Sequence, residues 1–205
     1  MNKTKIAWTD RSWNPVTGCT KVSQGCKNCY AERIFHRPYP GRAFTDVRCH
    51  PERLDQPLRW RKPCRIFVNS MSDLFHEAVP NDFLHAVFAV MAQTPQHTFQ
   101  ILTKRSERML SYLSERLLLE DIYAVWHGTS GAPAEAEAWP LPNVWLGVTV
   151  ENQRWADHRI PILLDTPAAV RFVSAEPLLG PVDLTSRNCE HNSLYGNICD
   201  GCGSE

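Results

Sequence analysis

The sequence predicts an α/β protein built on a parallel sheet, and two observations support this prediction. Four short runs rich in β-branched and aromatic residues have the length of strands. Segments between and after them repeat apolar residues at helical spacing. Strands that alternate with helices are typical of right-handed βαβ units, in which the strands are parallel. The expected strands are residues 65–70, 98–103, 143–150 and 170–176, and the expected helices are residues 80–94, 106–119 and 151–166.

Each expected element has its own justification. The apolar residues of these strands come in continuous runs, which indicates a sheet covered on both faces. The helix at 80–94 begins with Pro80 and a possible Asn or Asp cap. In the last expected helix, Pro161 should produce a kink or an end. Residues 127–142 are small, polar and rich in proline, which predicts a surface loop.

Composition and charge exclude some classes of protein. The chain has 22 basic and 22 acidic residues, so it has no strong overall attraction for nucleic acid. No apolar run is long enough for a transmembrane helix, and the start lacks the apolar middle of a signal peptide. We therefore expect a cytoplasmic protein. In a reducing compartment its eight cysteines are metal ligands or free thiols rather than disulfides.

One segment, residues 33–65, is locally basic. It contains eight arginines and one lysine but three acidic residues, interleaved with Phe35, Tyr39, Phe44 and Trp60. Such a pattern can bind a nucleic-acid backbone and stack bases. The alternative is a solvated loop that packs on the rim of the fold.

Polar side chains follow each of the expected strands. Ligands of parallel α/β folds bind at the carboxyl ends of strands, so these residues predict an active site at that edge. The alternative for any one of them is helix capping. The residues are Asn69, Ser70, Ser72 and Asp73, then Thr103, Lys104 and Arg105, then Thr149, Glu151 and Asn152, and finally Ser174 and Glu176.

Three cysteines near the start have the pattern C-x6-C-x2-C, at Cys19, Cys26 and Cys29. A structural zinc ion takes four protein ligands, whereas a [4Fe–4S] cluster on three cysteines leaves one iron open for a small molecule. The number of thiols therefore suggests a cluster. The alternative is a zinc site completed by a distant residue such as Cys49 or His36. Gly18 and Gly25 would let the backbone turn tightly around a bulky cofactor.

The segment "WTDRSWNPVTGCTKVSQGCKNCYAER" resembles a phage- and bacteria-associated family of uncharacterised radical S-adenosylmethionine (SAM) proteins, distantly related to spore photoproduct lyase. The similarity continues through "FVNSMSDLFH", "QILTKRSERM", "WLGVTVENQ" and "RFVSAEPLLGPV", and so covers most of residues 5–184. The resemblance implies a partial (β/α) barrel, with the cluster loop after the first strand. It also implies a [4Fe–4S] cluster, SAM, an electron donor, and a nucleic acid or nucleotide as a possible substrate.

The sequence departs from the wider superfamily in three ways. Most members have C-x3-C-x2-C, whereas the first gap here is six residues. Many have an aromatic residue before the third cysteine, but here Asn28 precedes it and Tyr30 follows it. Related proteins continue with another strand beyond the equivalent of Leu184. We therefore expect a barrel that lacks its last strand or strands, and an inactive shortened relative is one alternative.

Within this resemblance, we assign roles as a hypothesis. Cys19, Cys26 and Cys29 would hold the cluster. Hydroxyls and a carboxylate suit the methionine ammonium group, and basic side chains suit its carboxylate or a substrate phosphate. Acidic side chains could contact ribose hydroxyls or substrate. The residues concerned are Ser70, Ser72 and Asp73 for the ammonium, Lys104 and Arg105 for the carboxylate, and Glu151 and Glu176 for the ribose.

The tail, residues 185–205, is predicted to be a separate unit after a first unit at 1–184. Cys189, His191, Cys199 and Cys202 form a C-x-H-x7-C-x2-C pattern that could close a tetrahedral zinc site. Disordered reduced thiols and a second iron–sulfur cluster are the alternatives. Cys49 and Cys64 stand alone and are expected to be ordinary thiols.

Two classes of function remain open from the sequence. The first is a radical SAM enzyme of unknown substrate. The second is a non-catalytic, zinc-loaded module that binds nucleic acid or a protein partner.

Overall fold

The computed structural model describes residues 4, 6–115, 120, 122 and 139–185. Its centre is a five-stranded sheet in the order β1-β4-β5-β6-β7, and every neighbouring pair in it is parallel. The prediction of an α/β fold with a parallel sheet is confirmed. The strands are β1 (Arg11–Trp13), β4 (Arg65–Val68), β5 (Thr98–Thr103), β6 (Val144–Thr149) and β7 (Val170–Ser174).

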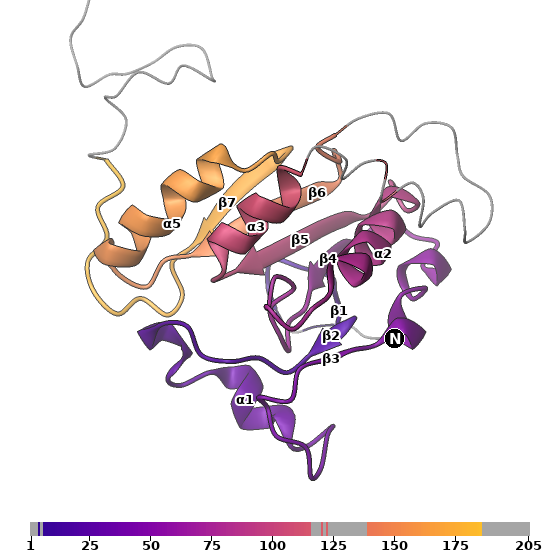
Figure 1. The fold of residues 1–205 in the computed structure, drawn as a ribbon, viewed down its shortest axis with the longest axis horizontal. Coiled ribbons are helices and arrows are strands. Elements are labelled where there is room, and N and C mark those ends of the chain that lie inside the picture. The colour runs from indigo at the N-terminus through magenta and orange to yellow at the C-terminus, as the bar shows by residue number, and fades with distance from the viewer. Residues whose placement is uncertain (1–3, 5, 116–119, 121, 123–138, 186–205) are drawn as a thin grey trace, which may run out of the picture.

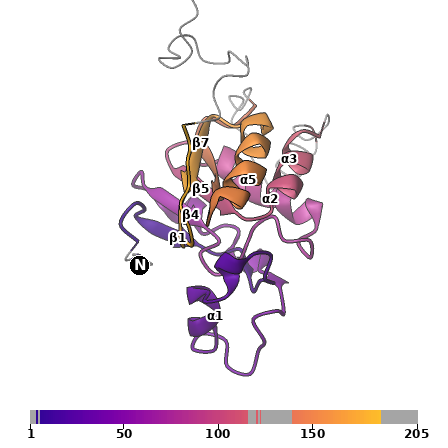
Figure 2. The same cartoon turned by 90° about the vertical axis from the view of Figure 1, so that its left-hand side faces the viewer.

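Three longer helices lie on one face of this sheet (Figures 1 and 2). They are α2 (Asn81–Ala92), α3 (Ser106–Leu113) and α5 (Gln153–Asp165). The strand residues that face them are apolar and buried, which makes this side the main core of the protein. They include Ile66 and Val68 of β4, Phe99 and Ile101 of β5, and Val144, Leu146 and Val148 of β6.

The opposite face of the sheet is less completely covered. Leu102, Trp145 and Phe172 alternate with the core residues and are only partly buried. The prediction of a sheet buried on both faces therefore holds only in part for this side, where Phe67, Gln100 and Thr149 are buried. The three longer helices all pack on the other face of the sheet (Figure 2).

A second, smaller region contains most of residues 16–60. It holds the antiparallel pair β2 (Val16–Thr17) and β3 (Arg48–Cys49) and the short helix α1 (Tyr30–Phe35). This region also contains three 3₁₀ helices, at Gln24–Cys26, Pro51–Arg53 and Pro57–Arg59. In Figure 1 the stretch with α1 lies beside one edge of the large sheet.

The last helix continues through its proline. Pro161 lies inside α5, so the helix does not end at this residue, which was one of the two predicted outcomes. Pro161 is exposed to solvent, so water can replace the hydrogen bond that its missing N–H leaves unmade. The helix begins after Asn152, whose side chain accepts a hydrogen bond from the N–H of Trp155 at 3.2 Å. For Asn152 the capping alternative is confirmed.

Several predicted features fall outside the described residues. They are the tail ligands Cys189, His191, Cys199 and Cys202, residues 116–119 of the second expected helix, and most of the loop at 127–142. Within the described residues, no helix is both long enough and apolar enough to cross a membrane.

Strand β1 was not located by sequence patterns, although the resemblance implied a first strand before the cysteines. It has three residues, too few for a periodic signal. Trp13 fixes it in place, because its side chain is fully buried and its indole N–H donates to the carbonyl of Arg53 at 2.8 Å.

Replacing Trp13 tests this anchor. Trp13→Ala should lower the free energy of unfolding by about 3–5 kcal/mol, since it opens a cavity and leaves the Arg53 carbonyl without its donor. Trp8→Ala is the control, because Trp8 is 37% exposed and should cost about 1 kcal/mol. Denaturant unfolding measures both, and equal losses would contradict this account of β1.

Candidate functional site

The cysteine loop starts directly after β2 and is bent back by a glycine. Gly18 has a φ of +90°, and a Cβ at this position would lie 2.5 Å from the carbonyl oxygen of Asp46. Its N–H donates to the carbonyl of Met71 at 3.2 Å, and the N–H of Cys19 donates to that of Phe44 at 2.8 Å. The first cysteine is thus held beside the segment that follows β4.

All three cysteines line one cavity of about 160 Å³. Some of the other lining residues belong to the cysteine loop and α1, and others come from the ends of β4, β5 and β6, because parallel strands bring their carboxyl ends to one edge. Of the residues expected to bind a cofactor, five line this cavity: Ser70, Ser72, Asp73, Lys104 and Arg105. Asn69, Thr103 and Thr149 line it as well, and Phe44, Phe67 and Leu102 give it an apolar wall.

The thiols share this cavity without converging on one point. Within the described residues, no three histidine, cysteine, aspartate or glutamate side chains form a group that could hold a metal ion. Burial and, to a smaller extent, the charge of Asp73 raise the pKa of the Cys19 thiol to about 11, although the nearby Arg105 acts in the opposite direction. Cys19 is therefore protonated at neutral pH in the metal-free protein, and a metal that binds it would release its proton.

Asp73 is occupied by the protein's own donors. One oxygen accepts from the Phe75 N–H at 3.1 Å and from the Thr103 hydroxyl at 2.7 Å. The other accepts from the Lys104 N–H at 3.1 Å and from Arg105 at 3.3 Å. This geometry favours a structural role for Asp73, which joins the ends of β4 and β5, over the ammonium contact that the sequence suggested.

Ser70 and Ser72 use their hydroxyl protons within the protein. Ser70 donates to the Asn14 side-chain oxygen at 3.1 Å, and Ser72 donates to the Val16 carbonyl at 2.8 Å. Their oxygens keep lone pairs that can accept a hydrogen bond. Both remain suited to a cationic ligand in the cavity.

Glu151 lies beneath the cysteine loop rather than in the cavity. It is 0% exposed. It accepts from the Ser23 hydroxyl at 2.7 Å and from Arg159 at 3.0 and 3.2 Å, and Lys104 lies 3.7 Å away. Glu151 thus joins the loop between the first two cysteines to β6 and α5. Its position does not favour the predicted contact with a ribose.

The second glycine of the motif is required by packing, not by its backbone angle. A Cβ on Gly25 would lie 2.5 Å from Cγ of Glu151 and 2.6 Å from its Oε1. The absent side chain lets the loop approach a carboxylate that Arg159 and Ser23 hold in place. Sequence reasoning expected a tight turn here and missed this contact, because Glu151 lies far along the chain.

Arg159 balances the buried charge of Glu151. It donates to the Thr149 carbonyl at 2.8 Å, and its guanidinium lies 4.0 Å from the ring centroid of Trp155. In the described part of the chain, its Nε and Nη2 have no hydrogen-bond partner, so the aromatic ring supplies their main contact.

Glu176 is the other residue predicted to contact a ribose or substrate. It lies beyond the end of β7 and is exposed. It does not line the cavity. The cavity therefore brings the three cysteines together with Ser70, Ser72, Asp73, Lys104 and Arg105, but not with Glu151 or Glu176.

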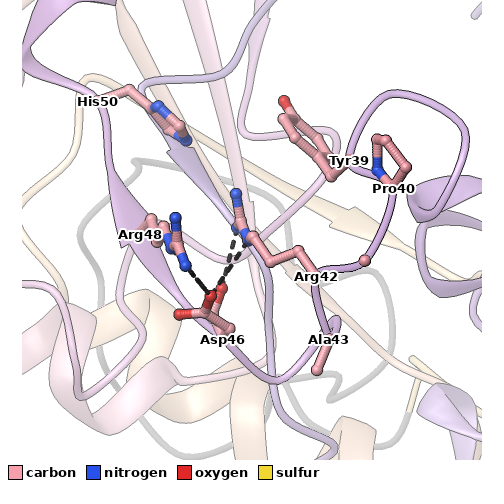
Figure 3. A pocket seen from close by; sticks show the side chains of 8 residues that line it. Tyr39, Pro40, Arg42, Ala43, Asp46, Arg48 and His50 are labelled. Atoms are coloured by element: carbon pink, nitrogen blue, oxygen red, sulfur yellow. Dashed lines mark hydrogen bonds and ion pairs between the residues drawn. The ribbon is translucent and has the colours of Figure 1, made fainter.

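The arginine-rich segment pairs largely with its own acidic and aromatic residues. Asp46 contacts Nε of Arg42 at 3.5 Å and Nη2 of Arg48 at 2.6 Å, beside an open hollow of about 600 Å³ (Figure 3). Arg42 also stacks on the rings of Phe35 and Tyr39, with 4.8 and 4.9 Å to their centroids. These contacts favour the interpretation of a segment that packs on the rim.

The fold and site define an α/β protein with a parallel sheet and a cysteine-lined cavity at its carboxyl edge. The chain belongs to the family described as a protein of unknown function (DUF5131), whose model matches residues 3–199. Comparison with curated proteins and with solved structures gives no match.

Removing the charge of Glu151 tests the buried pair. Glu151→Gln keeps the shape but leaves Arg159 without its counter-charge, so we expect a loss of about 3–5 kcal/mol in the free energy of unfolding. Glu107→Gln is the matched control, since Glu107 pairs with His158 near the surface and should cost about 1 kcal/mol or less. If Glu151→Gln unfolds with the same midpoint denaturant concentration as the wild type, the role of Glu151 is refuted.

A methyl group on Gly25 tests the close approach of the loop. Gly25→Ala should cost about 1–3 kcal/mol, because the Glu151 side chain has no room to move. Gly180→Ala is the control: its Cβ would lie 3.6 Å from its nearest neighbour, an ordinary contact. Thermal unfolding measures both variants, and a neutral Gly25→Ala would contradict the packing described here.

Proposed function

We propose that this protein is a radical SAM enzyme in which Cys19, Cys26 and Cys29 hold a [4Fe–4S] cluster. When bound, such a cluster supplies the electron that cleaves SAM and starts radical chemistry on a substrate. One observation carries the proposal: the three thiols line a single cavity at the carboxyl edge of a parallel sheet.

The donor set around the cavity fits a site with one open position. Of the lining residues, four have side chains that commonly bind metals, namely the three cysteines and Asp73. Asp73 is occupied by four internal hydrogen bonds. Cys49 and His36, the fourth ligands considered for zinc, do not line the cavity. This supports three thiolates with an open fourth position over a closed zinc tetrahedron.

Other residues would bind and orient SAM. The oxygens of Ser70 and Ser72 can accept from its ammonium group, while Lys104 can meet its carboxylate. Lys104 is 20% exposed at its side chain and lies 3.7 Å from Glu151, which fixes its position at the cavity wall. Phe44, Phe67 and Leu102 would exclude water from the reacting atoms.

The proposed substrate is a nucleic acid or a nucleotide. This class is implied by the distant resemblance to spore photoproduct lyase, a DNA-repair enzyme. An external electron donor is needed, because the chemistry consumes one electron for each SAM cleaved. The alternative, a zinc-loaded binding module without catalysis, is decided by the same experiment.

Anaerobic reconstitution with iron and sulfide tests the proposal. The wild-type protein should bind about four iron atoms and four sulfides per chain. It should also release 5′-deoxyadenosine when SAM and dithionite are added. Replacing Cys19, Cys26 and Cys29 by alanine should abolish cluster absorbance and 5′-deoxyadenosine formation.

The matched control is the double variant Cys49→Ala and Cys64→Ala. These thiols lie away from the cavity, so iron content and product formation should match the wild type. The proposal fails if the wild type takes up zinc alone, or if the triple variant keeps its iron.

A further inference from the structure

We propose that Arg105 is a positioning residue of this site: it fixes Cys19 at the carboxyl edge and donates a hydrogen bond to its sulfur. The inference rests on the proposed function only for the cluster that this sulfur would bind. The sequence suggested instead that Arg105 meets a ligand carboxylate or phosphate.

One side of the guanidinium holds the cysteine loop. Nη1 lies 3.6 Å from the sulfur of Cys19, and Nη2 donates to the carbonyl and the hydroxyl of Thr20 at 3.1 and 3.0 Å. Arg105 is 86 positions from Cys19 and 85 positions from Thr20 in the chain. A single side chain after β5 therefore fixes both the first cysteine and the residue that follows it.

The other side of the guanidinium is itself held by carboxylates. Nε donates to both oxygens of Glu77 at 3.1 Å, and Nη1 donates to Asp73 at 3.3 Å. Arg105 is 5% exposed. Its N–H groups are engaged in three directions, so a ligand anion would have to break these contacts to reach them. This geometry assigns Arg105 to positioning rather than to ligand binding.

The hydrogen bond to sulfur has an electronic consequence once Cys19 is a cluster ligand. The reduced cluster carries more negative charge than the oxidised one, so an N–H donor and a nearby cation stabilise the reduced form more. Arg105 should therefore raise the reduction potential of the cluster. A residue that only supported the fold would have no such effect.

Arg105→Gln and Arg108→Gln form a matched pair of variants. Arg108 lies on α3, which begins directly after Arg105, and it donates to the carbonyls of His76 and Val79 in the segment after β4. None of these contacts reaches Cys19 or Thr20. An effect seen in Arg105→Gln but not in Arg108→Gln therefore arises from the contacts with Cys19 and Thr20 and not from general damage around α3.

In the metal-free protein, hydrogen–deuterium exchange measures the positioning. Peptides covering residues 18–29 should exchange roughly tenfold to hundredfold faster in Arg105→Gln, the effect of losing charge-assisted hydrogen bonds. Arg108→Gln should leave these peptides near the wild-type rate, as should a reference peptide from β6 in both variants. Unchanged exchange in Arg105→Gln, or an equal increase in both variants, would overturn the assignment.

In the reconstituted protein, redox titration followed by electron paramagnetic resonance measures the electronic effect. Arg105→Gln should shift the potential to a more negative value, while Arg108→Gln should not. An unshifted potential in Arg105→Gln would overturn the hydrogen bond to sulfur. If the wild type binds no cluster, the proposed function fails, and the exchange experiment still decides whether Arg105 positions Cys19.

Discussion

Two buried charges of opposite sign hold the cysteine loop against the large sheet. Arg105, just after β5, holds Cys19 and Thr20 at one end of the loop. Glu151, just after β6, holds Ser23 and contacts Gly25 near the second cysteine. Each charge is compensated within the protein, Arg105 by Asp73 and Glu77, and Glu151 by Arg159. A loop with little secondary structure thereby gains a defined position.

The sheet makes this arrangement possible. Because all its strands run in parallel, the residues that follow β4, β5 and β6 emerge at one edge and can contact one another. Asp73 connects two of these strand ends through Thr103 and Arg105. The carboxyl edge is thus a rigid polar frame, and the cysteines are presented to a cavity between that frame and the loop. A site fixed by buried hydrogen bonds needs little reorganisation when a ligand binds.

The sequence predicted much of this frame but not how its residues are used. The strands from β4 to β7 follow from their apolar runs, and the polar residues after them were expected at one edge. Their internal partners were not foreseen, since Ser23 and Glu151 are 128 positions apart and Arg105 and Cys19 are 86 apart. One signal was present: the strand ends carry both acidic and basic residues, which can neutralise one another. Strand β1 and the pair β2 and β3 are too short to show a periodic pattern.

X-ray absorption at the iron and zinc edges of anaerobically reconstituted protein tests the central claim most directly. The account predicts iron surrounded by sulfur, with iron–iron scattering typical of a cubane cluster, and a change in the iron environment when SAM is added. The variant in which Cys19, Cys26 and Cys29 are replaced should lack this iron–iron scattering. Zinc bound by four protein ligands that include these cysteines, with no iron cluster, would contradict the account.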